Sequence, residues 1–251
     1  MKYLTPSLSL LTTAVKKVAS YVVKDHQELL YMHFGNNQTT NFANHTAIFL
    51  QRKLVEDISA IKPDYCFLIP GQQFVQNKDQ SNVVVVTGLT GFQQFSRGLA
   101  NFTISLTLMR DNKPLSAVVY QPLLDHLYTA ETGKGAFFNK RKLKASTTVS
   151  RGSSMLIATD CELNFSQLPK NVTPFSSNCP VLDLCNLASG RINGIIYGKP
   201  ISYLKSLAGI VIAQEADCNL SYQKEQDCLT KFIADNCCLS EHLLNLEKIF
   251  I

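Results

Sequence analysis

The chain has 251 residues, of which 45% are hydrophobic and 17% charged, with a net charge of +5 and no tryptophan. This length is enough for one large domain or two moderate ones with a hydrophobic core, and the composition excludes a disordered chain. The mild positive charge tolerates an acidic partner without requiring one. We interpret the basic run Lys140-Arg141-Lys142 as a solvated turn rather than a nucleic-acid site.

The N-terminal segment is apolar only in short pieces, because Pro6, Lys16 and Lys17 interrupt it. It therefore fits neither a signal peptide nor a membrane span. We expect a cytoplasmic protein without a membrane partner, whose eight cysteines are reduced. The cysteines follow no zinc-ligand spacing, and the five histidines form no spaced ligand set.

The first 149 residues are predicted to form an N-terminal α+β half. Apolar residues at three- and four-residue steps predict helices over 7–31 and 47–61, with a polar loop over 34–46 between them. Strands are predicted at 65–69 and 83–86, the second followed by a turn from Thr87 to Phe92. Further strands at 102–108, 115–120, 127–130 and 136–138 indicate a meandering antiparallel sheet, with a hairpin turn at Asp111-Asn112-Lys113-Pro114.

Residues 150–251 are predicted to form a smaller C-terminal α/β half. Strands at 154–159 and 192–197 alternate with helices at 182–189 and 204–216. The last helix carries one apolar stripe, formed by Leu204, Leu207, Ala208, Val211 and Ile212.

Several motifs resemble the inositol monophosphatase family, in its bacterial inositol-1-monophosphatase or extragenic suppressor form. Residues 127–139, LYTAETGKGAFFN, track the family's Leu-Phe-Thr-Ala-x-x-Gly-x-Gly-Ala-Phe-x-Asn. Residues 118–122, VVYQP, resemble its Val-Ile-Tyr-Asp-Pro, and residues 182–191 resemble its Leu-Asp-Leu helix with a closing Gly-Arg. The resemblance implies a layered αβαβα sandwich, a homodimer and Mg²⁺-dependent hydrolysis of phosphate monoesters.

The metal ligands that the resemblance implies are missing. The family's two motif aspartates fall on Thr87 and Thr90, the threonine of the same motif on Phe92, and a C-terminal aspartate on Lys205. Magnesium is held by several oxygen ligands, mainly carboxylates, so these four positions predict no metal and no catalytic residue. The family-like chain is thus expected to be a pseudoenzyme that acts through protein or anion binding.

The alternative is a Mg²⁺-dependent phosphatase of inositol or sugar monophosphates with weak or altered activity. Its carboxylates would have to come from Asp125, Asp183, Glu215 or Asp217. For the first three we favour structural roles, and Asp217 is left open.

The substituted positions also suggest where a ligand would bind. Lys205, with the backbone around Gly91 and Phe92, is a candidate site for a small phosphate or other anion. We favour the alternative, in which Lys205 is merely solvated at the rim of a collapsed pocket. By resemblance, Cys179 and Pro180 fall at the substrate pocket, and we expect the Cys179 thiol to be buried and inert rather than reactive. A bacterial branch of the family acts with transcription factors in ribosomal RNA antitermination, which suggests a protein partner in transcription or RNA processing.

Overall fold

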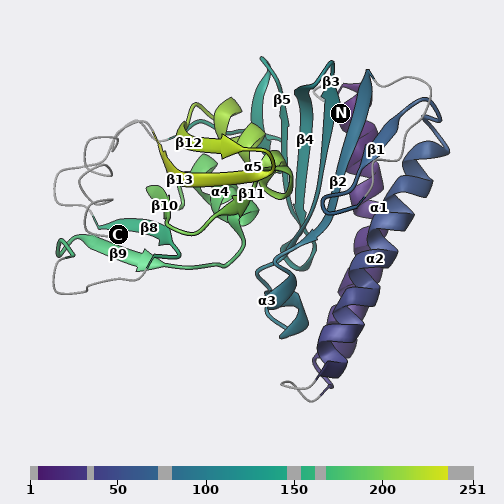
Figure 1. Cartoon of the computed structure of the whole chain (residues 1–251), viewed down its shortest axis with the longest axis horizontal. Helices are drawn as coiled ribbons and strands as arrows, with labels where there is room; N and C mark the ends of the chain where they lie inside the picture. The colour runs from purple at the N-terminus through teal and green to yellow at the C-terminus, as the bar shows by residue number, and fades with distance from the viewer. Residues whose placement is uncertain (1–4, 33–36, 73–80, 146–153, 162–167, 237–251) are drawn as a thin grey trace.

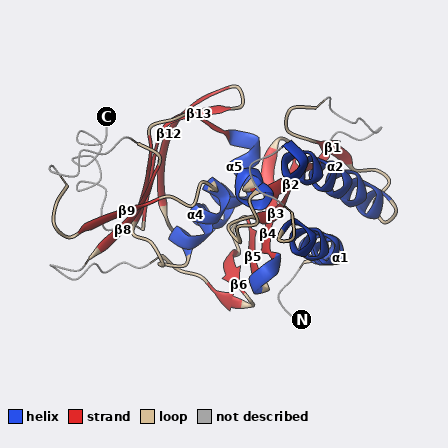
Figure 2. Cartoon of the chain, turned by 90° about the horizontal axis from the view of Figure 1, so that it is seen from below, coloured by secondary structure: helices blue, strands red, loops and turns tan. Residues whose placement is uncertain are grey.

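The computed structural model describes residues 5–32, 37–72, 81–145, 154–161 and 168–236. They form two sheets with helices on and between them, in the layer order helix, sheet, helix, sheet (Figures 1 and 2). The mixed α/β class expected from the sequence is therefore confirmed, and the described residues supply four of the five expected layers. None of the described helices combines the length and apolarity that a membrane span needs.

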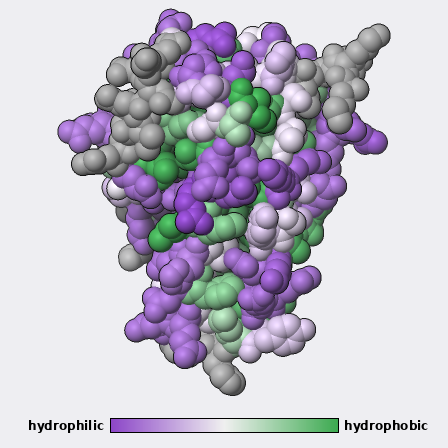
Figure 3. All heavy atoms as spheres, turned by 90° about the vertical axis from the view of Figure 1, so that its right-hand side faces the viewer, coloured by the Kyte–Doolittle hydropathy of each residue, from purple (hydrophilic) through white to green (hydrophobic). Residues whose placement is uncertain are grey.

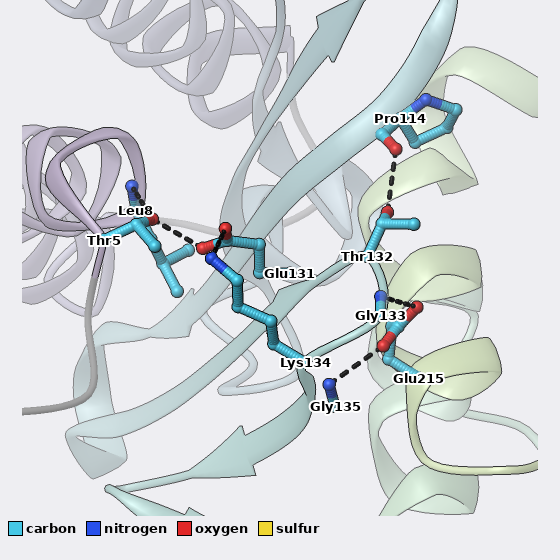
Figure 4. A network of polar contacts seen from close by, with 9 residues as sticks. All are labelled: Thr5, Leu8, Pro114, Glu131, Thr132, Gly133, Lys134, Gly135 and Glu215. Carbon is cyan, nitrogen blue, oxygen red and sulfur yellow. Dashed lines mark hydrogen bonds and ion pairs between the residues drawn. The ribbon is translucent and has the colours of Figure 1, made fainter.

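Helix α1 (Pro6–Leu29) matches the predicted first helix. Its buried stripe, which includes Leu11, Val15 and Val18, faces the first sheet and α2. At its start, the Thr5 hydroxyl donates to the Glu131 carboxylate at 2.5 Å and caps the Leu8 amide at 3.4 Å (Figure 4). This bond connects the beginning of α1 to the fifth strand of the sheet.

Helix α2 (Asn37–Ser59) begins ten residues before the predicted start, so the expected polar loop is wrong for residues 37–46. Its buried stripe continues through Thr39, Ala43 and Thr46 ahead of the apolar Leu50 and Leu54. Thr46 donates its hydroxyl to the Asp25 carboxylate at 2.6 Å, so a polar residue can face α1 without losing a hydrogen bond. The outer face of the molecule seen in Figure 3 is mainly hydrophilic, with scattered apolar patches.

The first sheet has the strand order β1-β2-β3-β4-β5-β6-β7. Its strands are β1 (Cys66–Leu68), β2 (Asn82–Thr90), β3 (Thr103–Arg110), β4 (Lys113–Gln121), β5 (His126–Glu131), β6 (Gly135–Phe138) and β7 (Arg141–Lys142). Only the β1–β2 pairing in this sheet is parallel. The predicted hairpin is confirmed, but its turn is shorter than expected, because Lys113 and Pro114 already belong to β4. Asp111 and Asn112 form the turn and have the positive φ that a tight hairpin turn requires, 50° and 61°. The basic run ends in the exposed β7 rather than in a turn.

The turn predicted to begin at Thr87 is wrong, because β2 continues to Thr90. The pairing with β3 shifts register between Val86 and Gly88, which lets the strand bend while it stays in the sheet. After Gly91 the chain forms the short helix α3 (Phe92–Ser96). A 3₁₀ turn, η1 (Pro122–Leu124), joins β4 to β5.

The second sheet has the order β11-β13-β10-β8-β9, with β12 on the other side of β13. The predicted strands appear as β8 (Met155–Thr159) and β10 (Gly194–Tyr197), which pair in parallel. The sequence did not predict β9 (Val172–Phe175), β11 (Ile201–Ser202) or the hairpin of β12 (Asn219–Glu225) with β13 (Cys228–Asp235). Strands β9 and β11 are short, and β12 is largely polar and exposed. Strand β13 is mostly buried, but Thr230 and Lys231 interrupt its apolar residues, so it gives no clear apolar alternation.

Helices α4 (Pro180–Ala188) and α5 (Tyr203–Glu215) lie between the two sheets. Every residue of α5 from Ser206 to Ala213 is buried, so the single predicted stripe is wrong: a helix covered on both sides is apolar nearly all round. Gly209 lets α4 approach closely, since a Cβ there would lie 3.0 Å from the Leu184 side chain.

Candidate functional site

A cavity of about 470 Å³ opens at the carboxyl end of β2, between α2, α3 and the first turns of α4 and α5. It brings together six residues that sequence reasoning had singled out from distant parts of the chain: Thr87, Thr90, Gly91, Phe92, Pro180 and Lys205. Sequence reasoning missed four polar residues that also line it: Asn44, Gln51, Ser202 and Ser206. Its volume is in the range of small-molecule sites.

The two threonines at aspartate-equivalent positions are engaged with protein partners. The Thr90 hydroxyl lies 2.5 Å from the hydroxyl of Thr103 on the neighbouring strand. The Thr87 hydroxyl donates to the Leu204 carbonyl at 3.5 Å, the outer limit of a hydrogen bond. Both residues are buried, and their oxygens are neutral. They are therefore poor replacements for carboxylate ligands.

Gly91 turns the chain from β2 into α3. Its φ of 78° lies in the left-handed region, and its carbonyl accepts the Phe95 amide at 2.9 Å. A Cβ at this position would lie 2.4 Å from the Asn101 carbonyl oxygen, so only glycine fits. Phe92 follows as the first residue of α3 and presents a half-buried ring to the cavity.

Lys205 is exposed in the first turn of α5, at the cavity rim, and forms no ion pair within the described part of the chain. The amides of this helix start are already satisfied. Leu204 donates to an Asp227 carboxylate oxygen at 2.6 Å, and Lys205 donates to the Ser202 hydroxyl at 3.2 Å. Ser202 in turn donates to Asp227 at 2.7 Å. An anion at this helix start would therefore be bound by the Lys205 ammonium rather than by the backbone amides of Leu204 and Lys205.

Cys179 lies just outside the cavity lining, while Pro180 begins α4 at the cavity wall. The Cys179 thiol is fully buried, 3.8 Å from the Thr90 hydroxyl. Burial raises the pKa of this thiol to about 11, so the nucleophilic thiolate is scarce at neutral pH. Among the described residues the thiols of Cys161, Cys179, Cys185 and Cys228 are free, and Cys237 and Cys238 fall outside the described residues.

The carboxylates considered for an alternative phosphatase site lie away from the cavity lining. Asp183 is buried and accepts the Tyr197 hydroxyl at 2.7 Å, and Asp125 accepts the Tyr120 hydroxyl at 2.8 Å. Glu215 accepts the amides of Gly133 and Gly135, both at 2.9 Å (Figure 4). Each therefore holds a structural contact, and Asp217 follows the end of α5 outside the cavity.

The Glu215 contact yields a stability prediction. Glu215→Ala removes two charge-assisted hydrogen bonds to the β5–β6 turn, and we expect it to lower the free energy of unfolding by about 2 kcal/mol. Urea denaturation measures this loss. Glu225→Ala, which removes an exposed carboxylate from β12, is the matched control and should change stability by less than about 0.5 kcal/mol. Equal losses of unfolding free energy in the two variants would show that the hydrogen bonds of Glu215 to the β5–β6 turn do not stabilise the fold.

The cavity does not fit the magnesium ions that the family resemblance implies. No described residue that lines it is acidic, and its one charged lining group is a cation. Nor does any cluster of three or more His, Cys, Asp or Glu side chains suited to a metal occur in the described ranges. Hydroxyl and amide groups without carboxylates give a doubly charged cation too little compensation for its lost hydration.

The sequence is similar to that of a known protein family. Residues 75–247 match the model of the inositol monophosphatase family. An inositol-1-monophosphatase of Rhizobium meliloti is 24% identical over 220 residues, covering 83% of this chain and 82% of the relative. The Nus factor SuhB of Pasteurella multocida is 22% identical over 224 residues, covering 85% and 84%.

The fold of this chain is also similar to that of solved structures of the same family. The crystal structure of the extragenic suppressor protein suhB from Bartonella henselae superposes with a TM-score of 0.81 at 22% identity, covering 98% of this chain and 99% of that one. Because the family model spans most of the sequence, the chain belongs to the inositol monophosphatase family.

Proposed function

We propose that this protein is a non-catalytic member of its family, which acts by binding rather than by hydrolysing phosphate esters. One observation carries the proposal: in the described lining of the cavity, Lys205 is the sole charged side chain. Its ammonium repels a divalent cation, and there is no carboxylate to offset that repulsion. Without a bound metal, the cavity has no means to activate a water molecule or to neutralise a phosphate dianion as metal-dependent hydrolases do.

The test is a calorimetric titration of the purified protein with magnesium chloride, with and without inositol-1-phosphate, beside a phosphate-release assay over a panel of monoesters. We expect no saturable magnesium binding and no turnover above the buffer rate. A family member that retains its carboxylates serves as the positive control. Turnover that rises with magnesium occupancy would contradict the proposal and favour the alternative of a weak phosphatase.

We further propose that a cytoplasmic homodimer presents this scaffold to a protein partner in transcription or RNA processing. Support comes from relatives that carry the name Nus factor SuhB and match more than four fifths of this chain. Light scattering should give twice the 27.9 kDa mass of one chain, and a monomeric mass would refute the dimer. Binding of the purified transcription complex from the same organism, measured by surface plasmon resonance, tests the partner.

A further inference from the structure

Three polar groups that line the cavity are left without partners by the described residues. They are the Lys205 ammonium at the rim, the Asn44 amide on α2 and the Ser206 hydroxyl on α5. Ser206 is the most informative of the three, because the residue is only 2% exposed and still lines the cavity. Polar side chains this deeply buried normally have a hydrogen-bond partner, so an open one in a cavity points to a ligand.

The remaining polar side chains of the cavity lining already have hydrogen-bond partners. The Thr87 hydroxyl donates to the Leu204 carbonyl at 3.5 Å. Gln51 donates to the Thr87 carbonyl at 3.3 Å and accepts from Gln72 at 3.3 Å. Thr90 is paired with Thr103, and Ser202 with Asp227. The described lining therefore offers a ligand one positive charge, no negative charge and two neutral hydrogen-bonding side chains.

This charge count selects the ligand class. One ammonium can balance one negative charge, whereas a second negative charge in the cavity would lose hydration without gaining a counterion. A phosphate monoester, which approaches two negative charges at neutral pH, is therefore a poor match in the absence of metal. A carboxylate carries a single charge and accepts hydrogen bonds from an ammonium group well.

We propose that the cavity binds a small, singly charged sugar acid, with its carboxylate at Lys205 and its hydroxyl groups at Ser206 and Asn44. The hydroxyl groups of a sugar acid suit Ser206 and Asn44, because a hydroxyl group and an amide group can each donate and accept a hydrogen bond. The inference rests on the proposed function, since it takes the site to work without metal. It assigns a ligand of different charge from a phosphate ester to the same cavity.

The test is isothermal titration calorimetry with sodium gluconate as the probe, in EDTA and at fixed ionic strength. Neutral myo-inositol and inositol-1-phosphate are the comparison ligands, and both should bind at least about tenfold more weakly than gluconate. Lys205→Met should weaken gluconate binding by about tenfold or more, and Ser206→Ala by about threefold to tenfold. Lys199→Met, which removes an exposed lysine outside the cavity, is the matched control and should leave the affinity unchanged.

Three results would overturn the sugar-acid site. The first is no gluconate binding at concentrations up to about 50 mM, which corresponds to a negligible affinity. The second is that Lys199→Met weakens gluconate binding as much as Lys205→Met does, and the third is that inositol-1-phosphate binds more tightly than gluconate in EDTA. Each leaves the proposed function standing as long as turnover is absent. Failure of the proposed function has a different signature, namely magnesium-dependent phosphate release. Circular dichroism of each variant shows whether a loss of binding reflects a loss of fold.

Discussion

Gly91→Ala is expected to lower the free energy of unfolding by more than about 3 kcal/mol. Two physical effects add. Alanine in the left-handed region costs about 1 kcal/mol more than glycine. The new Cβ would also lie 2.4 Å from the Asn101 carbonyl oxygen and 2.9 Å from the Phe102 Cα, and both neighbours are backbone atoms that cannot rotate away. The junction between β2 and α3 must therefore shift.

Gly133→Ala separates the two effects. Gly133 has the same φ of 78°, but a Cβ there meets no heavy atom within 4 Å. This variant should lose only the conformational part, about 1 kcal/mol, in the same urea denaturation experiment. Similar losses for the two variants would show that the clash at Gly91 relaxes without cost, contrary to the expectation.

The second large effect concerns Asp183 and its dependence on pH. Burial raises the pKa of this carboxyl to about 6 from 3.8, against the opposing effect of the Tyr197 hydroxyl that it accepts. Because the raised pKa belongs to the folded state, the folded protein holds this proton more tightly than the unfolded chain does. The wild type therefore loses stability from this group as pH rises from about 4 to about 6, by on the order of 2 to 3 kcal/mol.

Asp183→Asn removes this pH dependence and keeps an oxygen that can accept the Tyr197 hydroxyl. Relative to wild type, we expect the variant to gain about 2 to 3 kcal/mol between pH 4 and pH 7, measured by urea denaturation at each pH. Asp64→Asn, at an exposed carboxylate, should show no such trend. A stability difference between Asp183→Asn and wild type that stays constant over this range would refute the raised pKa.

Much of the fold could be predicted from the sequence where local chemistry and burial agree. The Asp111-Asn112 hairpin was predictable because both residue types tolerate the positive φ of the turn. The start of α2 was not, because Thr39 and Thr46 take core positions that periodicity reserves for aliphatic residues. The extension of β2 to Thr90 was missed for a related reason: glycine and threonine after four valines look like a turn, and only pairing with β3 keeps them extended.

The candidate site was predictable only through family resemblance. No pattern along the chain relates Thr87 to Lys205, and it is the packing of α5 against the first sheet that brings them to one cavity. Asn44 and Ser206 carried no signal, since each is an ordinary polar residue within a helix and belongs to no motif.

The hydrogen bonds between Glu215 and the β5–β6 turn make it possible to detect ligand binding in the cavity from outside the cavity. Lys205 and Glu215 lie ten residues apart on α5, which separates them by about 15 Å along the helix axis. Because α5 is buried along most of its length, we expect it to move as a rigid body. A ligand that displaces the first turn of α5 would therefore strain the two hydrogen bonds that Glu215, in the last turn, accepts from the amides of Gly133 and Gly135. Hydrogen-exchange rates at Gly133 and Gly135 thus report, from the other end of α5, whether an occupant of the cavity moves the helix or leaves it in place.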